Sequence, residues 1–498
     1  MVQCNHGLVQ IGRRDFIKTT AIASVAGSLP ATGIFAQEAA KPIKPIKPRY
    51  NGKQRKLLFL SSNPAVQEPL INSIKSIKEF DFVVDPIKVN YQNPKDIGKY
   101  IQGKEADVIF MCLTGAGLNS GIYAEYMGSL DIPVILLPVN FDLIMLEADV
   151  AATFRAKGTA AMLANSTEHA IELVKFAATP MLLEGKKAVI FGRPYDSTSV
   201  PMPNLNADYI YKHTGLQLEY RPIDELVSRL QSVDTAKAQK EMDRWKREAI
   251  KVTEASDQAI LDASRLYVLL RSIVDQEGLS GISIDCLNFT FSAKPILPYP
   301  CLSFTRLRDE GFAVPCEADV CGMITSMFLL EISRKPSFFY NTSSVDIKKS
   351  TAVLRHCVAP IRFLGQDAAP LPYIIRDYHG MGGVTPEVQF PIGAEVTMAG
   401  FSKDLKNFLL WPGRIQEGVK DTNRPSFENA PPNMQKMRRY CTNRAEVKIR
   451  EIDRFLQNIA GIHMAMVAGT YADAIQRALL RMNVTITGPV ESPVPEKA

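Results

Sequence analysis

Short, continuous apolar runs separated by helical stretches constrain the fold of this chain more than any other feature. The runs at residues 56–60, 107–112 and 133–138 are of this kind, and a helical stretch at residues 68–78 separates the first two. Strands that are apolar at every position are typical of a parallel sheet that helices cover on both faces. We therefore expect an open α/β domain at residues 54–180.

The same alternation resumes in the middle of the chain. Strand-like runs lie at residues 186–191, 217–221 and 281–285, and a long amphipathic helical stretch covers residues 235–276. This pattern predicts a second open α/β domain with a parallel sheet, at residues 181–345.

From about residue 336 the pattern changes to short strands punctuated by Gly and Pro. The strand-like segments are residues 352–354, 374–376, 395–398 and 408–411. Such spacing is typical of antiparallel strands. Residues 346–498 are expected to form a C-terminal antiparallel, barrel-like β domain, closed by a helical stretch at residues 452–480 and followed by a Pro-rich tail.

The N-terminus carries the pattern of a twin-arginine export signal. Arg13 and Arg14 are followed by Phe16 and by an uncharged stretch rich in Ala, Ser and Gly. This stretch is too short and too weakly apolar for a membrane span, which needs about 20 strongly apolar residues. We expect a signal peptide at residues 1–36, cleavage near Ala36, a Pro- and Lys-rich tether at residues 37–53, and a periplasmic location reached through the twin-arginine translocase.

Composition and cysteine spacing exclude several classes of function. The chain is 46% hydrophobic and 22% charged, which is typical of a globular protein, and its formal charge of +6 does not indicate nucleic-acid binding. It contains neither a Gly-x-Gly-x-x-Gly nor a Gly-Lys-Ser/Thr phosphate loop. Of the eight cysteines, Cys4 is expected to be lost with the signal peptide, and the odd number left means that at least one thiol is free or paired between chains. Folding in the reducing cytoplasm before export argues against a fold that depends on disulfides. Thiol redox chemistry through Cys286, Cys316 or Cys357 is a weaker hypothesis because no paired cysteine motif is present.

Acidic and histidine side chains in apolar surroundings are the clearest chemical signal. Glu317 and Asp319 lie just before an apolar helix expected at residues 321–330, where they fit either a helix cap or a pair of metal-binding carboxylates. His356 follows a strand-like run, and His463 lies in a strongly apolar segment. A single histidine in such surroundings is more often a hydrogen-bonded core residue than a metal ligand. Together with the acids the two histidines form the oxygen and nitrogen ligand set that suits Mn²⁺ and related divalent ions.

Residues 281–489 resemble the superfamily of L-fucose isomerase and L-arabinose isomerase. The matching segments are residues 316–319, 336–341, 354–357, 383–388 and 460–463. The resemblance implies two α/β domains followed by a β domain, and a homo-oligomeric enzyme that binds Mn²⁺ or another divalent metal. It also implies Glu317, His356 and His463 as metal ligands, with Asp319 as a further candidate.

The chain departs from this family at one position. Where the isomerases have a carboxylate after a Phe-containing turn, this chain has Tyr340 and Asn341. An amide cannot accept a proton at neutral pH, whereas the interconversion of an aldose and a ketose through an enediolate needs a base. The remaining candidates for the catalytic base are Glu317 and Asp319, and Asn341 is left as a substrate-binding residue.

Two more residues are candidates for substrate binding, and each has a simpler explanation. Asp285 ends a buried strand, where it could face the cleft or anchor a loop. His379 lies on a Gly-rich loop, where it could contact substrate or be exposed. The charged residues at positions 306, 308, 309 and 310 are expected to form a solvated helix face.

The function that the sequence favours is that of an exported, metal-dependent sugar isomerase-like enzyme, an intramolecular oxidoreductase acting on a small polyol or a free monosaccharide. The alternative is a non-catalytic periplasmic carbohydrate-binding protein that retains the isomerase fold. Asn341 favours the binding protein, whereas Glu317, His356 and His463 favour the enzyme.

Overall fold

A computed structural model describes residues 54–489, except residues 91, 129, 131, 197–201, 291–295 and 419–440. The expected signal peptide at residues 1–36 and the tether at residues 37–53 lie outside the described residues, as does the end of the tail. None of the helices within the described ranges is long and apolar enough to cross a membrane.

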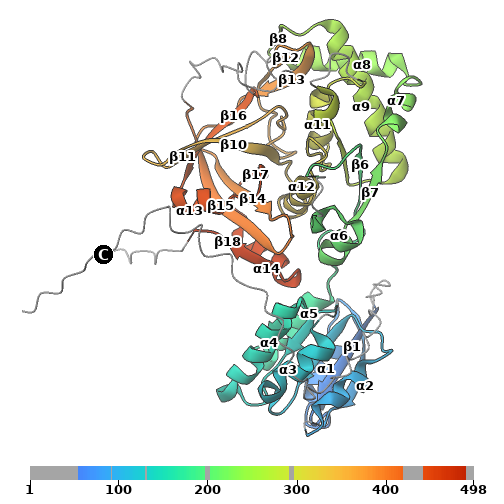
Figure 1. The fold of residues 1–498 in the computed structure, drawn as a ribbon, viewed down its shortest axis with the longest axis vertical. Helices are drawn as coiled ribbons and strands as arrows, with labels where there is room; N and C mark the ends of the chain where they lie inside the picture. Colours follow the sequence, from blue (N-terminus) through green and yellow to red (C-terminus); the bar gives the residue numbers. More distant parts are fainter. Residues whose placement is uncertain are drawn as a thin grey trace, which may run out of the picture. The chain divides into compact units, whose positions relative to one another are not determined.

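The first domain is a five-stranded parallel sheet of strand order β2-β1-β3-β4-β5. Its strands are β1 (Gln54–Ser61), β2 (Asp81–Lys88), β3 (Val108–Cys112), β4 (Val134–Leu136) and β5 (Ala161–Leu163). Side chains on one sheet face pack against α1 (Glu68–Lys75) and α5 (Thr167–Ala178), and those on the other face pack against α2 (Ile97–Ile101), α3 (Ser120–Met127) and α4 (Met145–Lys157) (Figure 1). Burial on both faces explains the continuous apolar strands.

The second domain holds a three-stranded parallel sheet of order β7-β6-β9. Its strands are β6 (Lys187–Phe191), β7 (Gln217–Arg221) and β9 (Gly281–Ile284). Its helices are α6 (Ala207–Thr214), α7 (Asp224–Leu230), α8 (Thr235–Glu248), α9 (Asp257–Glu277), α10 (Leu287–Thr290), α11 (Cys301–Asp309) and α12 (Val320–Ser333). The expected single helical stretch at residues 235–276 was wrong, because β8 (Lys251–Thr253) separates α8 from α9. Asp234 and Ser256 each cap the start of one helix with a side-chain oxygen.

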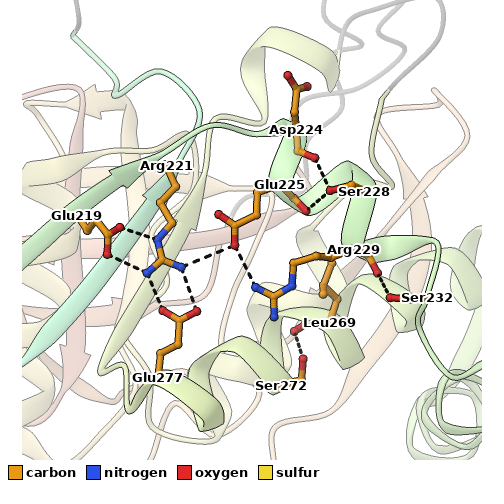
Figure 2. Close-up of polar contacts among 10 residues, drawn as sticks. All are labelled: Glu219, Arg221, Asp224, Glu225, Ser228, Arg229, Ser232, Leu269, Ser272 and Glu277. Carbon is orange, nitrogen blue, oxygen red and sulfur yellow. Dashed lines mark hydrogen bonds and ion pairs between the residues drawn. The ribbon is translucent and has the colours of Figure 1, made fainter.

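An ion-pair network joins the end of β7 to two helices. Figure 2 shows the guanidinium of Arg221 between Glu219 on its own strand, at 2.8 Å, and Glu277 at the end of α9, at 2.7 Å. Glu225 on α7 contacts both Arg221, at 3.7 Å, and Arg229, at 3.0 Å. These pairs hold α7 and α9 beside the edge strand of the sheet.

The third domain is a closed, six-stranded antiparallel barrel in which β14-β17-β10-β11-β16-β15 follow one another and β15 pairs back with β14. The barrel strands are β10 (Phe338–Asp346), β11 (Thr351–His356), β14 (Glu395–Phe401), β15 (Asn407–Gln416), β16 (Asn443–Ile449) and β17 (His463–Ala468). The short strand β18 (Thr485–Thr487) adds to β15, and helices α13 (Ile452–Gln457) and α14 (Ala472–Arg481) complete this part of the chain. The predicted fold class, two parallel α/β layers followed by an antiparallel barrel and a closing helix, is confirmed.

Two strand arrangements in the C-terminal part were not expected from the sequence. The barrel begins at Phe338, whereas we expected the β domain to begin at residue 346. The hairpin of β12 (Tyr373–Tyr378) and β13 (Gly383–Val388) forms a separate three-stranded sheet with β8. The second and third domains therefore share a sheet.

We expected a helical stretch at residues 452–480. This segment instead contains a strand between two helices. Residues 463–468 form β17, which pairs with β10 on one side and with β14 on the other. All six of its residues are buried, so its apolar run is that of a central strand rather than of a helix. His463 is thus the first residue of a barrel strand.

The expected solvated face on α11 was also wrong. All nine residues of this helix are buried, including Arg306, Arg308 and Asp309. Arg306 pairs with the buried carboxylate of Glu241 on α8 at 2.7 Å, and Arg308 donates to two backbone carbonyls. The charged side chains of α11 are therefore bound to partners inside the protein rather than to solvent.

Candidate metal centre

The side chains of Glu317, His356 and His463 converge on one point. Glu317 lies in the loop before α12, His356 ends β11, and His463 begins β17. The Nε2 atoms of the two histidines lie 3.7 Å and 3.3 Å from the two carboxylate oxygens of Glu317. One donor atom from each of the three residues lies within 4.8 Å of the other two. Because β11 and β17 both pair with β10, the barrel itself brings the two histidines together.

The two imidazole rings pack against the ring of Phe339 on β10. The Phe339 ring centroid is 5.0 Å from that of His356 and 4.5 Å from that of His463. Neither ring nitrogen of His356 has a hydrogen-bond partner among the described residues, and Nε2 of His463 faces the carboxylate of Glu317 at 3.3 Å. Because an unpartnered buried polar atom costs free energy, these nitrogens fit a site that a metal ion completes.

Asp319 fixes the orientation of His463. One carboxylate oxygen lies 2.8 Å from Nδ1 of His463, and the other accepts the backbone N–H of Gly322 at the start of α12. Asp319 is therefore a helix cap, one of its two expected roles. It also holds the tautomer of His463 that directs Nε2 toward Glu317, as carboxylate partners of metal-binding histidines do.

The two histidines differ in charge. Burial, followed by the positive charge of His463, holds the pKa of His356 well below its usual range. Burial alone would also lower the pKa of His463, but its hydrogen bonds to Asp319 and Glu317 prevail and raise that pKa to about 10. At neutral pH the metal-free protein therefore has a neutral His356 and a protonated His463.

The backbone at this site is strained. Glu317 and Ala318 have φ angles of 63° and 54°, which are left-handed conformations that side-chain-bearing residues rarely adopt. Each costs on the order of 1–2 kcal/mol. The carbonyl of Ala318 accepts the backbone N–H of Tyr195 at 3.0 Å, and the Tyr195 ring lies 5.4 Å from that of His463. Tyr195 was missed in the sequence because nothing in its local pattern marks a site.

Of the two other predicted substrate-binding residues on strands or strand ends, Asp285 is not a member of the Glu317 group. Asn341 lies opposite His463 in the β10–β17 ladder, and its amide donates to the carbonyl of Ile462 at 3.4 Å. Asp285 accepts the backbone N–H of Arg193 at 3.0 Å, which is the loop-anchoring role that we weighed against substrate binding.

His379 is not exposed, contrary to one of its two expected roles. It is buried in a second group of metal-binding residue types, with Cys357 and Cys441. The hydrogen bond with Cys357 lowers the pKa of the Cys441 thiol to about 5, and the same bond raises the pKa of Cys357. Cys441 gave no signal in the sequence because it lies far along the chain from the other two.

Comparison with protein-family models and with curated proteins finds no match for this chain. Its function must therefore be inferred from the geometry and chemistry of its own residues.

Proposed function

We propose that this chain is an exported, metal-dependent sugar isomerase-like enzyme that interconverts an aldose and a ketose in the periplasm. The observation that carries the proposal is the convergence of Glu317, His356 and His463, with donor atoms within 4.8 Å of one another. A carboxylate and two imidazoles suit Mn²⁺ and other divalent first-row ions. The resemblance of residues 281–489 to the L-fucose and L-arabinose isomerase superfamily supports the same function, and Arg13 and Arg14 support export.

The proposed roles follow from how the side chains are engaged. A divalent ion held by Glu317 and the two histidines would supply the Lewis acid that stabilises negative charge on the sugar oxygens. The side chain of Glu317 is 18% exposed, whereas those of His356 and His463 are 2% and 1% exposed. Glu317 is thus the group of this site that a substrate can reach, and we assign it the proton transfer beside the carbonyl. Both oxygens of Asp319 are occupied, so Asp319 serves as a positioning residue rather than as the base.

The test is the exchange of solvent deuterium into a panel of aldoses and ketoses with Mn²⁺ present. The wild-type protein should introduce deuterium beside the carbonyl of at least one sugar. Glu317→Gln keeps the size of the side chain but removes its charge and its ability to accept a proton, so it should lose most of this exchange. Glu395→Gln, on the exposed side of a barrel strand, should retain it. If the wild-type protein exchanges no deuterium into any sugar of the panel, the enzyme proposal is wrong.

A carbohydrate-binding protein without catalysis is the second candidate, and Asn341 is the observation that favours it. Asn341→Asp would restore a carboxylate at the position where the resembling isomerases have one. An increase in exchange on this substitution supports the enzyme, whereas sugar binding without exchange in both forms supports the binding protein.

A further inference from the structure

We propose that Cys357, His379 and Cys441 form a second metal site, which binds a thiophilic ion, Zn²⁺ or Cu⁺. The three side chains come from three segments: the residue after β11, the turn between β12 and β13, and the residues that precede β16. The Sγ atom of Cys357 lies 3.3 Å from Nε2 of His379 and 3.3 Å from Sγ of Cys441. The third side of the triangle, from Cys441 Sγ to His379 Nε2, is 3.9 Å.

These distances fit ligands of one metal ion. Bond lengths of about 2.3 Å to sulfur and 2.0–2.1 Å to nitrogen place tetrahedral ligand atoms roughly 3.5–3.8 Å apart. The observed triangle needs adjustments of only a few tenths of an ångström. A disulfide, in contrast, requires sulfur atoms about 2.05 Å apart, much closer than the 3.3 Å between Cys357 and Cys441.

The surroundings hold the group in place before any ion binds. The buried amide of Asn443 donates to the carbonyls of Cys357 and Pro386 at 2.9 Å each and accepts the backbone N–H of Val388 at 2.8 Å. It therefore ties the end of β11 to β13. His379 adopts a left-handed conformation, with φ of 52°, at the turn that directs it toward the two thiols.

The chemistry of this site differs from that of the Glu317 site. Thiolates select Zn²⁺ and Cu⁺, whereas a carboxylate with imidazoles accepts Mn²⁺. Since Cys357 follows His356 directly, the chain offers two neighbouring sites for two classes of ion. Two thiolates and one imidazole also leave a coordination position open, as in catalytic rather than structural zinc sites.

The test uses the full exported chain, reduced and stripped of metal, and titrated with Co²⁺ as a spectroscopic probe. Wild-type protein should develop thiolate-to-cobalt charge-transfer absorption that rises with added Co²⁺ and saturates. Cys357→Ser and Cys441→Ser should lose this absorption. The absorption should persist in Cys321→Ser, because the thiol of Cys321 contacts Asn204 and is not part of the group. It should also persist in Glu317→Gln. Elemental analysis of protein isolated without chelators then distinguishes Zn²⁺ from Cu⁺, and either ion supports the proposal.

Three results would overturn this assignment. The first is the absence of a charge-transfer band in wild-type protein whose thiols titrate as free. The second is an unchanged band in both cysteine variants. The third is a Cys357–Cys441 disulfide in protein isolated without oxygen. Cys441 is only partly buried, so its serine variant is expected to fold. Circular dichroism of each variant checks the fold independently of metal binding.

Discussion

Asp319 illustrates how one residue can serve both the fold and the site. Its sequence position before an apolar helix fitted either a cap or a metal-site carboxylate, and the structure shows it capping α12 while it holds His463. The residue types at positions 317, 356 and 463 were informative because buried acids and histidines are uncommon. The strain at Glu317 and the contribution of Tyr195 could not be predicted, since both depend on how distant segments meet.

Asp319→Asn should separate the two roles of this side chain. Its amide oxygen can still cap α12, but its NH₂ group cannot accept the proton of His463 Nδ1. In the neutral imidazole the proton would then move to Nε2, the atom that faces Glu317. We expect Mn²⁺ affinity to fall roughly 10- to 100-fold with little change in melting temperature. Electron paramagnetic resonance titration measures the affinity. Asp319→Ala should lose the cap as well, at a further cost of about 1 kcal/mol. Equal Mn²⁺ affinity in Asp319→Asn and wild type would show that Asp319 does not position a ligand.

Metal affinity should depend on pH through His463. The pKa of this residue in the metal-free protein is raised to about 10, and a metal must displace its Nε2 proton. His356 is already neutral and contributes no such proton. Mn²⁺ affinity should therefore rise with pH above neutrality, by at most about tenfold per pH unit, and level off as His463 loses its proton. Calorimetry in buffers of different ionisation enthalpy counts the released proton. Release of no proton at pH 7.5 would contradict this account.

At the scale of elements, α11 and β17 show where sequence patterns are ambiguous. A cluster of charged residues usually faces solvent, yet the three charged residues of α11 are buried, and Arg306 pairs with Glu241. The apolar run of β17 fits a buried helix as well as a central strand, and its six-residue length between Gly461 and Gly469 was the better guide. The sequence predicted the start of α12 to within one residue, because helix capping depends on local residues alone.

The buried pair between α8 and α11 gives a stability prediction. Glu241→Ala should leave the guanidinium of Arg306 buried without its closest partner, at a cost of about 3–5 kcal/mol. Glu248→Ala is the matched control, because the Glu248 side chain is 37% exposed and lies 3.2 Å from the same arginine. Its loss should cost less than about 1 kcal/mol. Urea unfolding followed by tryptophan fluorescence compares the two variants, and similar costs would rule out the proposed role of burial.

At the scale of the whole molecule, the order of the α/β and β parts along the chain could be predicted from the sequence. The strand pairings that close the barrel and link the β12–β13 hairpin to β8 could not. Alternating buried runs identified the two parallel layers, since each strand carries its own signal. β15 pairs with β14 and closes the barrel, and β12 pairs with β8 in a second sheet. The sequence pattern of a strand does not indicate which other strand it pairs with. The group of Cys357, His379 and Cys441 could not be predicted either, because its members lie on segments far apart in the sequence.

Export is a property of the whole chain that can be tested at two residues. Replacing Arg13 and Arg14 together by Lys should keep the protein in the cytoplasm, because the guanidinium pair is read by shape as well as charge. Cell fractionation and immunoblotting measure the distribution, with a cleaved periplasmic form expected only for the wild type. Undiminished periplasmic recovery of the double variant would refute the proposed signal.

The most direct test of the central claim is the anomalous scattering of crystals grown with Mn²⁺. Data collected on both sides of the manganese absorption edge should show a peak about 2.0–2.3 Å from a carboxylate oxygen of Glu317 and from Nε2 of His356 and His463. The peak should disappear in Glu317→Gln. A well-ordered site without this peak, or manganese bound only elsewhere, would contradict the assignment of a metal centre to these three residues.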